Sequence, residues 1–131
     1  MDEEKAKAEG LEPLAKVRGY AFVGYEPKRF GLSPVKAIPA ALARAGMELS
    51  DVDLVELNEA FAAQYLGCER QLNLDREKAN VHGGAIAMGH PVAATGSKIL
   101  TTLLYGLDGQ VYAVAQGGIS LGGWNLRSPA P

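Results

Sequence analysis

Two side chains in the sequence have a type and a position that suit proton transfer or carbonyl chemistry. His90 lies between Gly89, which frees the backbone, and Pro91, which stiffens it. An imidazole held still at such a turn suits general base catalysis near neutral pH, provided that a nucleophile lies within hydrogen-bond reach. The simpler interpretation is a loop histidine bonded to a backbone carbonyl, and composition alone favours it.

Asn58 is the second candidate, because it follows a short apolar run at residues 52–57. Its side chain either caps a helix at residues 59–72 or uses its amide to hold a water or substrate oxygen. These uses compete, since capping takes the side-chain oxygen. Cys68 shares an apolar helical stripe with Phe61, Tyr65 and Leu72, which predicts a buried, inert thiol. His82, beside two glycines, is expected to be a turn residue.

The segment from Gly89 to Lys98 superficially resembles a phosphate-binding loop. Six residues separate Gly89 from Gly96, and Ser97 precedes the lysine, so the spacing is not that of a P-loop. Thr95 lies at an expected helix N-terminus. It either caps that helix or belongs to a group of free N–H donors that hold an anion.

Composition sets the remaining boundaries. The 131 residues are 47% hydrophobic with a net charge of −2, which fits one domain and suggests neither nucleic-acid nor membrane binding. One cysteine and two histidines provide no metal-ligand spacing, so no metal is expected. The acidic N-terminus is unlike a signal or transit peptide. We therefore expect a reducing, cytoplasmic location, with mitochondria or peroxisomes open if a longer parent chain carries a targeting signal.

The patterning predicts alternating helices and strands. Helices are expected at residues 2–9, 34–45, 59–72 and from about 95 to 107, and strands at 15–25, 52–57, 111–115 and 119–126. Residues 27–33 and 80–96 are predicted loops, and the end of the chain after residue 127 is predicted to fray. Pro39 should kink its helix or delay its start. The result is a layered α/β domain whose final hairpin makes the sheet mixed.

Two segments resemble the thiolase (acetyl-CoA acyltransferase) family, in its carboxy-terminal half: Glu56-Leu-Asn-Glu-Ala-Phe-Ala-Ala-Gln64, and Asn80-Val-His-Gly-Gly-Ala-Ile-Ala-Met-Gly-His-Pro91 running on to Thr95-Gly96. Segments 31–35 and 53–57 also match in order and spacing. The resemblance extends from Glu3 to about Val114, and residues 64–70 look most like the 3-ketoacyl-CoA branch. It implies one domain over residues 1–131, a three-layer α/β/α half-domain that lacks its first strand and diverges after about residue 115.

The resemblance also implies a chemistry divided between two halves. A cysteine from the absent first half would attack an acyl-CoA thioester, and His90 would activate it. His90 would also line an oxyanion hole, together with a water held by Asn58. Phe61 would face the acyl or pantetheine channel, and Gly89 would contact the substrate. Coenzyme A enters as substrate, and no cofactor is implied.

Three departures from the family pattern limit this expectation. The family usually has a second cysteine near the C-terminal end. This sequence has Gly118 at that position if residues 112–114 are matched to the family, or Ala115 if the glycines are matched. Ala93 replaces a usual glycine, and Pro39 is unusual. We therefore expect no turnover by the chain alone. Two alternatives remain open: a degenerate module for oligomerisation or binding, and a subunit of a split enzyme. Either way we expect a homo-oligomer or a thiolase-like partner, with acyl-CoA bound only once a first half completes the site.

Overall fold

A computed structural model describes residues 1–106 and the two later strands at 112–117 and 122–127, for which only the backbone is considered. The helices are α1 (Glu3–Ala8), α2 (Pro34–Arg44), α3 (Ala62–Leu72), α4 (Ala85–Met88) and α5 (Thr95–Gly106). The strands are β1 (Lys16–Ala21), β2 (Leu54–Leu57), β3 (Tyr112–Gly117) and β4 (Gly122–Arg127). Two short 3-10 helices, η1 (Pro27–Leu32) and η2 (Leu49–Asp51), complete the described part. The turn of the predicted final hairpin follows Gly117 and lies outside the described residues. The end of the chain, which is predicted to fray, also lies outside them.

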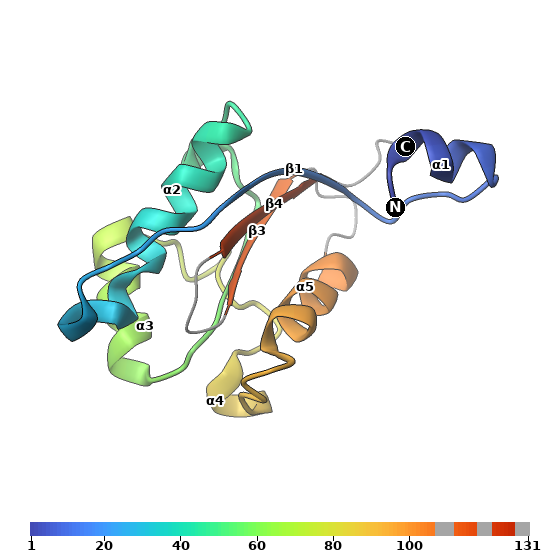
Figure 1. Cartoon of the computed structure of the whole chain (residues 1–131). Coiled ribbons are helices and arrows are strands. Elements are labelled where there is room, and N and C mark those ends of the chain that lie inside the picture. The colour runs from blue at the N-terminus through green and yellow to red at the C-terminus, as the bar shows by residue number, and fades with distance from the viewer. Residues whose placement is uncertain (107–111, 118–121, 128–131) are drawn as a thin grey trace.

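The elements form three layers, as the sequence predicts (Figure 1). Helices α2 and α3 cover one face of the sheet and α5 covers the other, while α1 stands apart beyond the start of β1. The strand order is β1-β4-β3-β2. β2 pairs parallel with β3, whereas β3–β4 and β1–β4 are antiparallel. The sheet is therefore mixed and carries the predicted final hairpin.

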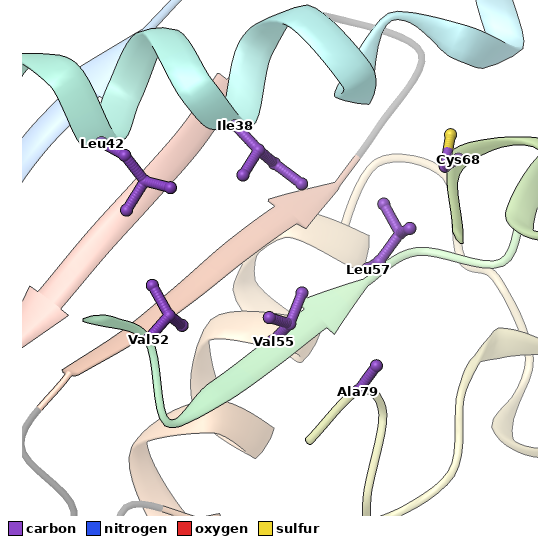
Figure 2. Close-up of a cluster of buried hydrophobic side chains, with 7 residues drawn as sticks. All are labelled: Ile38, Leu42, Val52, Val55, Leu57, Cys68 and Ala79. Atoms are coloured by element: carbon purple, nitrogen blue, oxygen red, sulfur yellow. The ribbon is translucent and has the colours of Figure 1, made fainter. Parts of the chain in front are cut away.

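The main core lies between β2 and the helices α2 and α3. Its buried members are shown in Figure 2: Ile38, Leu42, Val52, Val55, Leu57, Cys68 and Ala79. A second cluster joins Leu54 on the opposite side of β2 to Ile99 and Leu103 of α5. Because both faces of β2 are covered, all four of its residues are buried. This explains why the apolar residues there do not alternate with polar ones, with Glu56 as the one charged residue of the strand.

Three local predictions were wrong. β1 ends at Ala21 rather than at residue 25, and its register with β4 shifts between Val17 and Gly19. Residues 27–32 form η1 rather than an irregular loop. Helix α2 starts at Pro34 and runs through Pro39 without a delay. The ring of Pro39 lies on the exposed face, and the buried stripe beside it still packs on the sheet.

Candidate functional site

Asn58 directly follows the last residue of β2 and is 4% exposed. The structure excludes the capping role, because α3 begins at Ala62 with Phe61 at its N-cap position. The first helical turn instead receives support from Gln64, whose Oε1 accepts from the backbone N–H of Ala60 at 3.1 Å. The side chain of Asn58 is therefore free of a capping bond and available to a site at the end of the strand.

The structure brings His90 to Asn58 across 32 residues of sequence. The Nδ2 of Asn58 lies 3.4 Å from the Nε2 of half-buried His90. Gly89 just before it has a φ of 85°, a conformation that favours glycine, so the backbone can turn between α4 and His90. The two candidate side chains therefore lie together beyond the carboxyl end of β2.

A small polar network fixes the start of the histidine-bearing segment. The side chain of Asn80 accepts from the N–H of Leu57 at 2.8 Å and donates to the C=O of Leu57 at 2.9 Å. Glu59 accepts from Asn80 at 3.3 Å and from the N–H of Ile86 at 3.0 Å. A Cβ on Gly84 would lie 2.1 Å from the carboxyl carbon of Glu59, so this glycine makes room for the carboxylate. Residues 80–86 are thereby attached to the end of β2.

A second attachment holds the turn that carries His90. The Nζ of Lys98, in α5, donates to the C=O of Gly89 at 2.6 Å. Ala93, where the family usually has glycine, is exposed in a turn and does not have a positive φ. An alanine therefore fits the turn without backbone strain. The departure from the family pattern at position 93 therefore requires no unusual backbone conformation.

Thr95 neither caps α5 nor forms part of an anion site through its hydroxyl. Its Oγ1 donates to the C=O of Pro91 at 3.0 Å and lies 2.7 Å from the Nδ1 of His90. The N–H of Lys98 donates to the C=O of Ala94, so the helical bonding starts one residue before Thr95. Thr95, whose side chain is fully buried, is thus a contact of His90, a role that neither of the two interpretations from the sequence includes.

Glu56 is a buried carboxyl that sequence reasoning missed. Only 4% exposed, it lines a cavity of about 10 Å³ together with Asn58, Lys98 and Thr102. The Oδ1 of Asn58 is also buried and has no hydrogen-bond partner among the described residues. Burial raises the pKa of Glu56 to about 7, the charge of Glu59 adds to this shift, and Lys98 opposes it. The floor of the site thus holds a carboxyl that changes charge near neutral pH.

This shift predicts a pH-dependent stability. The unfolded chain releases the Glu56 proton near pH 4.5 and the folded chain near 7, so the folded state binds more protons between these values. The free energy of unfolding should therefore fall as pH rises through this window, by about 2 kcal/mol in order of magnitude. Glu56→Gln should remove that fall. Guanidinium unfolding at about pH 5 and about pH 8 measures it, with exposed Glu77→Gln as the matched control. Equal pH slopes in wild type and Glu56→Gln would contradict the assignment.

The other sequence candidates occupy different positions. Phe61 is 66% exposed and has left the buried stripe, because it precedes the first turn of α3. Cys68 is fully buried, donates to the C=O of Gly31 at 3.4 Å and accepts from Gln64 at 3.6 Å. Burial raises the pKa of this thiol, which fits the predicted inert cysteine. His82 lies exposed in a turn, as expected.

Two other features, a metal site and a membrane-spanning helix, were considered over the described part of the chain. Within residues 1–106 and the two later strands, no group of three or more His, Cys, Asp or Glu side chains could hold a metal ion. Over the same residues, no helix has the length and apolar character needed to span a membrane.

The layered mixed sheet, with a His–Asn pair at the carboxyl end of a strand, defines a thiolase-like half-domain. A model of the family described as "Thiolase, C-terminal domain" matches residues 11–124. The chain belongs to the thiolase family and corresponds to its C-terminal domain. The family predicted from the sequence is therefore confirmed, and so is the fold class.

Curated relatives and solved structures agree with this membership. The chain is 46% identical over 123 residues to the acetyl-CoA acetyltransferase of Escherichia coli (strain K12), covering 94% of this chain and 31% of the relative. It is 51% identical over 111 residues to a probable acetyl-CoA acyltransferase of Staphylococcus aureus (strain N315), covering 85% and 28%. The crystal structure of human mitochondrial 3-ketoacyl-CoA thiolase superposes with a TM-score of 0.93 at 46% identity, covering 98% and 34%. The chain thus spans about a third of the length of these proteins.

Proposed function

We propose that this domain supplies the base and an oxyanion-binding group for acyl transfer from a coenzyme A thioester, to a cysteine carried by a thiolase-like first half. The observation that carries the proposal is the approach of His90 Nε2 to Asn58 Nδ2, 3.4 Å apart at the end of a buried strand. This arrangement offers a proton acceptor beside an amide donor, the pair that thioester attack requires.

The proposed step has a simple proton balance. His90 takes the proton of the attacking thiol, and the new sulfur–carbon bond forms as negative charge moves to the thioester oxygen. Asn58 stabilises that oxygen through a bound water, with His90 as the second donor once it is protonated. The bond to the coenzyme A sulfur then breaks, and the proton passes to the leaving thiolate. Gly89 and Phe61 are proposed substrate contacts, since Gly89 directly precedes His90, Phe61 follows Asn58 by three residues, and both are exposed.

Exposed apolar side chains near the proposed site support the proposal that another protein packs against it. Phe61, Ile86, Met88 and Val92 are between 45% and 66% exposed, and they belong to the segments that flank Asn58 and His90. A group of this kind is typical of a surface that packs against another protein. We propose that a thiolase-like first half, or a second copy of the chain, covers it.

A chimera tests the proposal directly. The chain replaces the aligned third of the Escherichia coli acetyl-CoA acetyltransferase, and the rapid release of free coenzyme A from acetyl-CoA reports acylation. We expect one equivalent of coenzyme A per site from the chimera and none above background from the chain alone. The matched control is a chimera whose nucleophilic cysteine is replaced by serine. A correctly folded chimera that fails to acylate would contradict the proposal.

One observation favours a second candidate. The sequence has a single cysteine, Cys68, and the structure buries it in the core, so the chain offers no second thiol for proton transfer at the acyl α-carbon. A binding or oligomerisation module that has lost catalysis fits this composition. The same chimera separates the two functions, because a non-catalytic module would assemble with the first half without supporting acylation.

A further inference from the structure

The hydroxyl of Thr95 has two partners, and together they determine which nitrogen of His90 carries the proton. The Oγ1 is 3.0 Å from the C=O of Pro91 and 2.7 Å from the Nδ1 of His90. A carbonyl only accepts, so the single hydroxyl proton of Thr95 is directed to Pro91. The oxygen of Thr95 is then an acceptor for His90, and the Nδ1 must be the donor.

The opposite side of the ring leads to the same assignment independently. Nε2 lies 3.4 Å from the Nδ2 of Asn58, an amide nitrogen that only donates. The nitrogen that faces it is therefore an acceptor, and in a neutral imidazole this places the proton on Nδ1. Two separate neighbours thus select one tautomer.

We propose that Thr95 is a positioning residue that holds neutral His90 in the Nδ1–H tautomer and leaves the lone pair of Nε2 toward Asn58. A histidine side chain in water prefers the Nε2–H form. In that form the Nε2–H of His90 and the Nδ2–H of Asn58, both donors, would face each other. It would also leave no lone pair on Nε2 to accept a thiol proton. The catalytic meaning of this role rests on the proposed function, whereas the tautomer itself does not.

The surroundings suit Thr95 to this task. Its side chain is fully buried and β-branched, so its χ1 angle has little freedom. It occupies the first turn of α5, and the C=O of Gly89, next to His90, is held by Lys98 from the same helix. One helix end therefore fixes both the backbone before the imidazole and the proton on its ring.

Long-range ¹H–¹⁵N correlation spectra of the labelled chain test the proposal, because only His82 and His90 contribute. The wild-type chain should show His90 as Nδ1–H above its titration range. Thr95→Ser, which keeps the hydroxyl, should retain that form. Thr95→Val, which keeps the shape and loses the hydroxyl, should convert part of His90 to Nε2–H, because only Asn58 still favours the Nδ1–H form. The signals of exposed His82 should not change in either variant.

Two results would overturn the proposal: an Nε2–H tautomer at His90 in the wild-type chain, or an unchanged Nδ1–H tautomer in folded Thr95→Val. An Nε2–H wild-type spectrum overturns the proposal even if the valine variant does not fold. In the chimera, Thr95→Val should slow acylation about 10- to 100-fold. This loss of rate is smaller than the one expected when a catalytic histidine is held entirely in the wrong tautomer. Thr95→Ser should retain most of the unmodified rate.

The two proposals fail in distinguishable ways. If the tautomer responds to Thr95 while the wild-type chimera never acylates, the acyl-transfer function is wrong and the positioning role stands. If the chimera acylates in a His90-dependent manner while neither tautomer nor rate responds to Thr95→Val, the positioning role is wrong and the acyl-transfer function stands.

Discussion

His90→Ala should slow acylation of the chimera by about 10²- to 10⁴-fold, the range that loss of a positioned general base produces. Without the imidazole, the attacking thiol has no neighbouring acceptor for its proton, and the oxyanion loses one donor. Stopped-flow measurement of coenzyme A release gives the rate constant at saturating acetyl-CoA.

His82→Ala is the matched control, because the only other histidine is exposed in a turn. It should acylate at close to the unmodified rate. Asn58→Ala should lie between the two, with a loss of about 10- to 10³-fold from the missing oxyanion support. If His90→Ala acylates within about threefold of the unmodified chimera, His90 is not the base.

Asn80→Ala should lower the free energy of unfolding by about 3 kcal/mol. The side chain of Asn80 satisfies both the N–H and the C=O of Leu57, a residue that is 1% exposed. Each buried backbone group left without a partner costs roughly 1–3 kcal/mol. Alanine is also less tolerant than asparagine of the φ of 51° at this position. Denaturant unfolding of the purified chain measures the loss.

Asn73→Ala provides the comparison that separates these two causes. Asn73 has the same φ of 51° at the C-cap of α3, and no hydrogen bond of its side chain is found among the described residues. Its replacement should cost only about 1 kcal/mol, the strain of the left-handed conformation. Equal losses in the two variants would show that the bonds of Asn80 to Leu57 contribute nothing.

The fold could be predicted from the sequence where a pattern is local. The final hairpin and the buried run of β2 followed from strand patterning, and the stripe of α5 from helical spacing. β1 could not be bounded this way, because its alternation continues past Ala21 while the pairing with β4 does not. Pro39 misled for a related reason: its ring points to the exposed side, so the buried stripe of α2 is unaffected.

The site was only partly predictable, because its contacts join segments that are distant in the sequence. His90 and Asn58 could be named from their motifs. The capping role considered for Asn58 was wrong because α3 begins later, with Phe61 at its N-cap and Gln64 bonded to the N–H of Ala60. The position of Thr95 before a helix suggests a cap or a place among anion-binding N–H groups, whereas its hydroxyl bonds to groups four and five residues earlier. Glu56 offered one signal, a charged residue inside an apolar run, although its burial depends on the α4 and α5 segments that pack over that face of β2.

The pairing of β1 with β4 has a consequence for how the molecule folds. Lys16 pairs with Arg127 and Ala21 with Gly123, so the earliest of the four described strands must wait for the latest of them. Contacts between residues so distant in sequence are slow to form, because a long loop must close before they stabilise anything. On the ribosome, β1 would emerge with Val17 and Tyr20 uncovered and no strand beside it. We therefore expect slow refolding, and aggregation of incomplete chains that end before residue 122, to be the main kinetic hazards of this domain.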